Sequence, residues 1–447
     1  MRAESDGTHG RRAPGPESQK LVAEEAQWLA PGMQRLATLA GVAMQSGQGC
    51  VLQDVDGRSY LDFVAGVGVA SLGHSHPRWA AAIAAQAAQL SIGSFTSVPR
   101  LALLELLAAI LPEPLRRVQL YSGGAEAVEA ALRLAKAHTG KFEVVAFWGG
   151  FHGKSGGVLP LIGDPFKRGW GPLAPGAHLV PYADCYRCPL KLRHPSCGLA
   201  CVDVARQQLR AASLGSIAAV LVEPIQGTAG NVVPPPDWLP AIRELAREFD
   251  ALLVIDEMIT GFARTGTMFG FEPSGVVPDV MTVGKGFGGG FPVTAVVASD
   301  EIARAEPWSR PSSSSSSVGG NPLAAAAALA TVETILDEKL VENSRRVGAR
   351  MLERLRRMQE RFACIGHVRG RGLLLGMDLV RERATKEPLP TAITERIYTT
   401  CLERGLLAMT YGARVRINPP LVIREAEADA GLDILESVLA DVVGERA

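Results

Sequence analysis

Two short apolar runs, each ending at a charged residue, constrain the fold of this chain more than any other feature. Residues 251–255 (Ala-Leu-Leu-Val-Ile) lead to Asp256, and residues 280–283 (Val-Met-Thr-Val) lead through a glycine to Lys285. Runs of this length and composition predict buried strands. Open α/β sheets bind ligands beyond the carboxyl ends of their strands, so we expect Asp256 and Lys285 to meet at that edge of a sheet.

The residues around Lys285 narrow the chemistry of the site. Five glycines lie within residues 284–290, and glycine lets the backbone approach a flat ligand closely. Asp279 and Gly286 occupy the positions where a phosphate-binding P-loop requires Gly and Ser or Thr, and residues 291–297 predict a strand where a dinucleotide fingerprint opens a helix. A lysine that forms a Schiff base, with an acid that pairs with a pyridinium nitrogen, instead suits pyridoxal 5′-phosphate (PLP).

Composition excludes several classes of partner. The chain has 447 residues, 47% of them hydrophobic, which is enough for one large domain or two to three smaller ones. Lys plus Arg equals Asp plus Glu at 46 each, which argues against nucleic acid. The sequence has no run of 18 apolar residues, so no membrane span is predicted. Residues 1–25 lack the apolar core of a secretory signal, so we expect a flexible tail and a cytoplasmic location.

Three further stretches place polar or aromatic residues at predicted strand or helix ends. Residues 121–125 (Tyr-Ser-Gly-Gly-Ala) predict a glycine turn that opens a long helix, and a helix amino end suits a phosphate, although Gly-Gly also precedes ordinary capped helices. Phe151 and His152 follow a predicted strand, where an aromatic side chain can stack on a planar ring or simply fill the core. Glu223 follows another predicted strand, and in isolation it is a loop acid.

These motifs together resemble the class III PLP-dependent aminotransferases of fold type I, such as the ornithine, acetylornithine, 4-aminobutyrate and ω-amino acid enzymes. The resemblance is carried by Asp256-Glu257, Thr260-Gly261-Phe262, Arg264-Thr265-Gly266, Pro278-Asp279 and Gly284-Lys285-Gly286, and it extends from about residue 49 to about residue 423. It implies an α/β fold with a mainly parallel central sheet flanked by helices. It also implies a smaller α+β domain formed by the C-terminal part and the N-terminal segment.

The resemblance also implies domain limits. They comprise a tail (1–25), an N-terminal segment (26–75), a large PLP-binding domain (76–340, with a cysteine-rich insertion at 181–203) and a small C-terminal domain (341–447).

Roles for individual residues follow from the same resemblance. Lys285 and Asp256 would be catalytic, and Glu223 and Arg416 would bind substrate, with Arg416 on the carboxylate. Three places depart from the family. Gly123 occupies the place of a phosphate-binding hydroxyl, and Ile259 that of a common Gln. Thr228-Ala229-Gly230 follows Gly227 where the family often has Gly-Glu-Gly or Gly-Glu-Ala after the Gln. The residues expected to hold the cofactor, in addition to Asp256 and Lys285, are Gly124, Ala125, Phe151, His152, Met258 and, from the neighbouring subunit, Ser317.

The function implied is transfer of an amino group from an amino acid or ω-amino donor to a 2-oxo acid, by a homodimer with shared active sites. The same scaffold also supports amino acid racemases, epimerases and aminomutases, and the sequence leaves these open. A third alternative, a non-catalytic metal-binding protein, is disfavoured because Lys285 and Asp256 are both present.

The segment 181–203 is not required by the family motifs. It holds four of the seven cysteines, Cys185, Cys188, Cys197 and Cys201, in the pattern C-x2-C-x8-C-x3-C. Four thiolates can bind zinc or an iron–sulfur cluster. Free thiols and disulfides are the alternatives, and disulfides suit a reducing cytoplasm least. No metal ligand is assigned, and none of these states is expected to take part in catalysis. His74 and His76, two residues apart, predict a structural role because no third ligand is near in the sequence.

Overall fold

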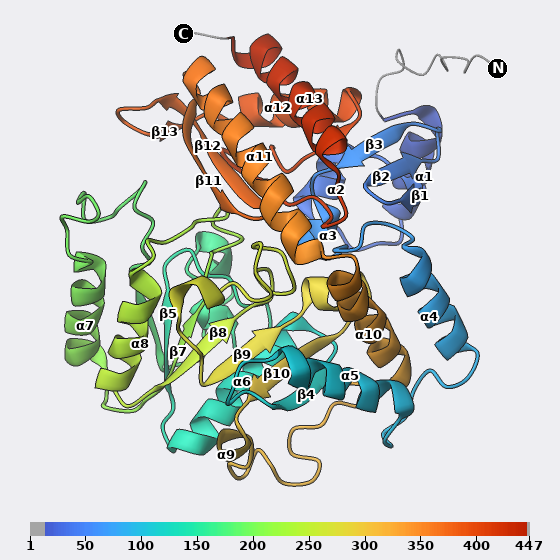
Figure 1. Ribbon diagram of the computed structural model, residues 1–447. Coiled ribbons are helices and arrows are strands. Elements are labelled where there is room, and N and C mark those ends of the chain that lie inside the picture. The colour runs from blue at the N-terminus through green and yellow to red at the C-terminus, as the bar shows by residue number, and fades with distance from the viewer. Residues whose placement is uncertain (1–13, 445–447) are drawn as a thin grey trace.

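The computed structural model describes residues 14–444 and is built around one seven-stranded sheet (Figure 1). The strand order is β4-β10-β9-β8-β7-β5-β6, and β10 is antiparallel to both of its neighbours whereas the other pairs are parallel. The expected mainly parallel central sheet is therefore confirmed. The strand bounds are β4 (Arg117–Tyr121), β5 (Glu143–Phe147), β6 (Ala177–Val180), β7 (Ile217–Val222), β8 (Leu252–Asp256), β9 (Val280–Val283) and β10 (Thr294–Ala298).

Helices cover both faces of this sheet because its central strands are apolar on both sides. Along β8, Val254 packs with α6 on one face, while Leu253 and Ile255 join the larger core cluster on the other face, to which α8 also belongs. The helix bounds in this part are α4 (Pro77–Ala87), α5 (Val98–Ile110), α6 (Gly124–Thr139), α7 (Ala200–Ala212), α8 (Trp238–Glu248), α9 (Asp300–Ala303) and α10 (Pro322–Asp337).

The C-terminal part forms a second, smaller layer of sheet and helices, seen at the top of Figure 1. Its strands are β11 (Ile365–Arg371), β12 (Leu374–Glu382), β13 (Glu387–Pro388) and β15 (Arg414–Ile417), all antiparallel along β12. The helices α11 (Leu340–Arg361), α12 (Thr391–Glu403) and α13 (Glu425–Val443) accompany them.

The N-terminal segment joins the C-terminal part through a shared sheet. Strands β1 (Met44–Gln48), β2 (Val51–Asp54) and β3 (Ser59–Asp62) form a meander, and β14 (Leu406–Leu407) pairs in parallel with β3. This pairing forms the expected smaller α+β unit, to which both the N-terminal segment and the C-terminal part of the chain contribute. The limits of 26–75, 76–340 and 341–447 stay predictions.

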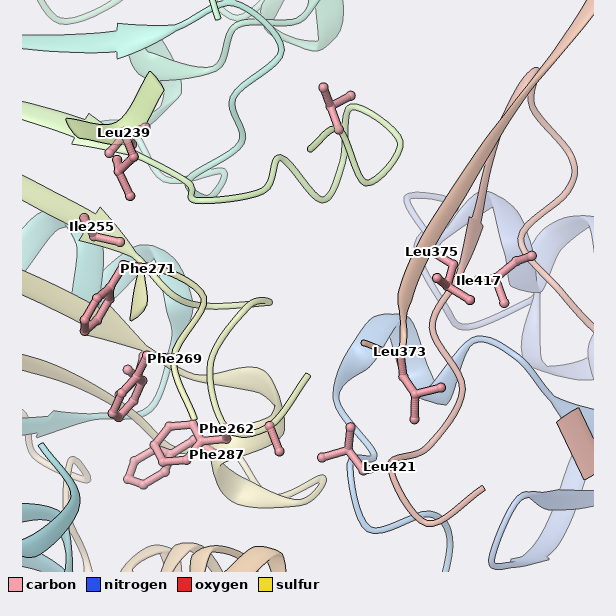
Figure 2. Close-up of a cluster of buried hydrophobic side chains, with 14 of the residues drawn as sticks. Leu239, Ile255, Phe262, Phe269, Phe271, Phe287, Leu373, Leu375, Ile417 and Leu421 are labelled. Carbon is pink, nitrogen blue, oxygen red and sulfur yellow. The ribbon is translucent and has the colours of Figure 1, made fainter. Parts of the chain in front are cut away.

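The core continues from the large sheet into the C-terminal part. The rings of Phe262 and Phe287 are stacked 4.8 Å apart, and Phe269 and Phe271 are stacked 5.7 Å apart. Figure 2 shows these four rings on one side and Leu373, Leu375, Ile417 and Leu421 on the other. All belong to one buried cluster, so an apolar contact joins the two parts.

The expected flexible tail is wrong for residues 16–25. These residues form α1 (Pro16–Glu25), while residues 1–13 lie outside the described part of the chain. Proline at the first helical position favours the helix, and the Asp56 carboxylate accepts the N–H groups of Glu17 (3.0 Å) and Ser18 (2.9 Å) at its amino end. Such a long-range cap is invisible in the local sequence. Within residues 14–444, no helix is both long and apolar enough to cross a membrane.

Candidate active site

The parallel pairing of β8 and β9 brings the two predicted catalytic side chains to one edge of the sheet. Asp256 is the last residue of β8 and lies opposite Thr282 of β9, and Lys285 follows β9 by two residues. Both side chains line a cavity of about 900 Å³. The strand-end argument from the sequence therefore places them correctly.

Three donors hold the Asp256 carboxylate at the base of this cavity. His152 Nδ1 lies 2.8 Å from Oδ2, and Oδ1 accepts the Met258 N–H and the Thr282 hydroxyl, both at 3.1 Å. His152 and Asp256 are buried. Burial is the largest single influence and opposes a charge on His152, but the hydrogen bond to Asp256 and the negative charges of Asp256 and Glu223 together outweigh it and raise the pKa of the imidazole. Thr282 was not among the residues predicted from the sequence, although a polar residue within the apolar run 280–283 is a usable signal.

Lys285 extends toward the same cavity from a constrained backbone. Its φ is +43°, in the left-handed region, which is strained for a residue with a side chain. A Cβ on the preceding Gly284 would lie 2.5 Å from the Met258 sulfur, so only glycine fits there. Burial holds the pKa of the Lys285 amine below its ordinary value, although the carboxylates of Asp256 and Glu223 act in the opposite direction. Within residues 14–444, Lys285 Nζ has no hydrogen-bond partner.

The amino end of α6 forms another wall of the cavity. Gly124 and Ala125, the first two residues of the helix, line it together with Ser122. The Glu126 carboxylate accepts the N–H groups of Ser122 (3.1 Å) and Gly123 (3.2 Å), which fixes the turn and leaves the first helical N–H groups free. This is the geometry of an anion site. Although Gly123 replaces the family's hydroxyl, the neighbouring Ser122 reaches the same cavity.

Glu223 and Arg416 face the cavity from different elements. The Glu223 carboxylate accepts the backbone N–H groups of Phe151 and Gly227, both at 3.0 Å, and burial raises its pKa. Arg416 lies on β15, where burial lowers its pKa while a hydrogen bond to Tyr411 opposes that change. Within the described chain, Glu223 and Arg416 form no ion pair with each other.

The remaining predicted residues divide into those that reach the cavity and one that does not. Phe151 and Met258 line it, and the Phe151 ring meets Phe166 edge-on at 6.5 Å. Ser317 is exposed and lies outside this lining. One chain therefore brings together every proposed site residue except the one assigned to the neighbouring subunit.

Other residues of the lining were not anticipated. Residues 33–36 of the N-terminal segment, together with Lys154, Thr294 and Tyr411, border the cavity. Thr294 donates to the Gly123 carbonyl at 3.1 Å and so fixes the turn before α6. Residues 33–36 are far from the motifs in the sequence, whereas Lys154, Thr294 and Tyr411 lie close to His152, within the strand predicted at 291–297 and close to Arg416. Only the three-dimensional packing shows that all of them border the cavity.

Each of the two histidines near the N-terminus has a carboxylate partner. His74 Nε2 lies 2.8 Å from Asp62, and His76 Nε2 lies 3.1 Å from Glu338. Between residues 14 and 444, no group of three or more His, Cys, Asp or Glu side chains is already arranged as a metal site.

The observed side chains fit PLP. The cavity has an anion site at the amino end of α6, a buried carboxylate backed by His152, and an amine without a protein partner. A phosphate, a pyridinium nitrogen and an aldehyde need these three groups respectively. The fold and the site therefore define a PLP-dependent enzyme of fold type I.

Comparison with known proteins specifies the family. Residues 33–439 match the family described as aminotransferase class-III. The acetylornithine aminotransferase of Methanothermobacter thermautotrophicus is 36% identical over 405 residues, which cover 90% of this chain and 94% of that protein. The leucine/methionine racemase of Thermococcus litoralis is 35% identical over 422 residues, which cover 92% of this chain and 94% of that protein.

A solved structure agrees with this result. An amine transaminase from an uncultivated Pseudomonas species, in its PLP-bound form, superposes with a TM-score of 0.87 at 32% identity and covers 93% of this chain and 99% of that one. The chain belongs to the class III aminotransferase family, so it is a transaminase and its cofactor is PLP.

Proposed function

We propose that this enzyme transfers the amino group of a carboxylate-bearing amine, an amino acid or ω-amino acid, to a 2-oxo acid. One observation carries the proposal. The Lys285 amine and the Arg416 guanidinium, which has no carboxylate partner within residues 14–444, both line the same cavity, so a substrate can present an amino group to one and a carboxylate to the other.

PLP, when bound, withdraws electrons from the substrate carbon that bears the amino group. Lys285 then acts as the proton carrier at that carbon. Because burial lowers the pKa of its amine, the neutral form that can accept a proton is more populated than for a solvated lysine. The constrained backbone of Lys285 fixes the position from which its side chain extends toward the cavity.

The other cofactor contacts are positioned by hydrogen bonds within the protein. Asp256 would hold the protonated ring nitrogen, with His152 and Thr282 orienting its two oxygens. The N–H groups of Gly124 and Ala125 would bind the phosphate. Phe151 and Met258 line the same cavity and would lie against the two faces of the ring.

Glu223 explains why Arg416 is available to a substrate. Two backbone N–H groups hold the Glu223 carboxylate, so it has partners without Arg416. A guanidinium that lacks a carboxylate partner in a buried position is a strong site for a substrate carboxylate, which it can bind through two parallel hydrogen bonds.

A donor and acceptor panel tests this function. We expect amino acid donors to convert bound PLP to its amino form and to release product only when a 2-oxo acid is added. Replacing Arg416 by Gln should raise KM for these donors by about tenfold or more, because a buried charged hydrogen bond is lost. The KM for an amine without a carboxylate should change little.

Inversion of an amino acid's configuration without any 2-oxo acid would instead establish a racemase, the activity named for the Thermococcus litoralis relative.

We also propose that the enzyme is a homodimer in the cytoplasm. Apolar side chains are exposed around the start of α5, with Phe95 at 88% and Val98 at 84% exposure. The backbone of Gly320, near Ser317, packs against Arg100 of the same region. A second copy would bury this surface and receive Ser317 at its phosphate site. All seven cysteines are free, as in proteins of a reducing compartment.

Light scattering of matched variants checks the assembly. Phe95→Asp should weaken the dimer and lower activity in a concentration-dependent way, because it places a charge in an apolar interface. Phe142→Asp is the control, since Phe142 is also exposed (50%) but lies at the start of β5. A monomeric wild-type protein with full turnover would contradict the proposal.

A further inference from the structure

The cysteine-rich segment closes on itself in the structure. Cys185, Cys188, Cys197 and Cys201 all line one cavity of about 20 Å³, although they span 17 positions of the chain. A volume of this size holds a single water-sized or ion-sized species and nothing larger. The fold therefore brings the four cysteines to one small cavity, outside the active site.

The local backbone suits sulfur ligands at both ends of the segment. The first pair lies on a turn, in which the Arg187 N–H binds Asp184 (3.1 Å) and the Lys191 N–H binds the Cys188 carbonyl (3.0 Å). Cys201 lies in the first turn of α7, close to the helix amino end. Backbone N–H groups at a helix amino end favour a thiolate.

We propose that these four cysteines bind one thiophilic divalent metal ion, with Zn²⁺ as the chemical type. The side chains are not already arranged as a metal site, so the ion would draw the sulfurs together within a segment of turns. Binding converts four thiols to thiolates, releases four protons to solvent and leaves a site of net charge −2. No oxidant or reductant is needed.

The proposed site would stabilise the contact between the cysteine-rich segment and the C-terminal sheet. Between the first two cysteines, Tyr186 stacks on His367 of β11 with ring centroids 4.6 Å apart. Arg187 donates to the Asp378 carboxylate of β12 at 2.8 Å and to the Lys386 carbonyl at 2.8 Å. The metal-bound turn would thus present its two middle residues to β11 and β12.

The cysteine-rich segment is also linked to β15, the strand that carries Arg416. Asp184, next to Cys185, accepts a hydrogen bond from Arg414 at 3.1 Å, and Arg414 lies two residues before Arg416 on β15. Arg414 also donates to the Ala229 carbonyl at 2.7 Å, in the loop that follows Glu223. A rigid turn at Cys185–Cys188 would therefore position β15 and, with it, Arg416. This effect on the substrate site rests on the proposed role of Arg416.

Metal analysis of the full-length enzyme tests the site independently of turnover. Protein from zinc-supplemented cells should contain one zinc per subunit, and its X-ray absorption should show four sulfur neighbours at about 2.3 Å. Cys188→Ser with Cys197→Ser should lose the zinc, whereas Cys364→Ser, which alters a buried cysteine outside the cluster, should keep it. The double variant should retain PLP and show a several-fold higher KM for carboxylate donors with a smaller change in kcat.

Three results would overturn the metal site. They are wild-type protein without stoichiometric metal after zinc supplementation, a zinc shell of nitrogen and oxygen atoms, or disulfides within the cluster in unreduced protein. Because the wild-type measurement needs no variant, poor folding of the double variant does not affect the test. An intact zinc site in a protein without transaminase activity would reject the proposed function while leaving this site in place.

Discussion

Replacing Lys285 by Ala is expected to lower turnover by at least ~10⁴-fold, because both the covalent anchor of the cofactor and the proton carrier are removed. The visible absorbance of lysine-bound PLP should disappear, while the protein folds as before. No described residue depends on Lys285 Nζ for a hydrogen bond, so its loss leaves no buried group without a partner.

Lys154→Ala is the matched control for this experiment. Lys154 is the other lysine of the cavity lining, with its Nζ 5.0 Å from the centre of the Phe166 ring. We expect this variant to keep the absorbance of lysine-bound PLP and most of its turnover. If Lys285→Ala retained full activity, the assignment of Lys285 would be wrong. If the two variants lost activity equally, the loss of turnover would be caused by the change in the cavity's charge and not by the loss of the Lys285 amine.

Much of the site could be predicted because strand ends are local features. Asp256, Glu223 and Lys285 each follow a short apolar run, and the rule that ligands bind at the carboxyl edge of a parallel sheet needs no knowledge of the tertiary contacts. The amino end of α6 was equally local, since two glycines precede a helical pattern.

The parts that escaped prediction depend on contacts between distant segments. Residues 33–36 reach the cavity beside α12, where the Tyr398 hydroxyl donates to the Leu36 carbonyl at 2.9 Å, and Thr282 reaches Asp256 through the pairing of β8 with β9. The helix α1 was missed for the same reason, because its cap, Asp56, lies 38 residues from Ser18. Propensity and charge describe one segment at a time and do not contain this information.

The second large effect is expected at Asp256. Asp256→Asn keeps the size of the side chain and its place in a buried position, but it removes the negative charge that would stabilise a protonated ring nitrogen. We expect turnover to fall by about 10²–10³-fold, which is typical for the loss of one preorganised electrostatic contact in a site shielded from water. Because Lys285 is intact, the variant should still bind PLP covalently, so spectrum and turnover should separate.

Thr282→Val tests whether the charge of Asp256, and not merely its surroundings, produces this effect. The substitution removes one hydrogen bond at 3.1 Å from Asp256 Oδ1 and leaves the bond to His152 in place. Its loss should cost about 1 kcal/mol, or roughly five- to tenfold in turnover, because one neutral hydrogen bond contributes about that much. Steady-state kinetics of the two variants should therefore differ by at least about tenfold. An Asp256→Asn enzyme within twofold of wild type would show that another group holds the ring nitrogen, and His152, buried against the same carboxylate, would be the first residue to test.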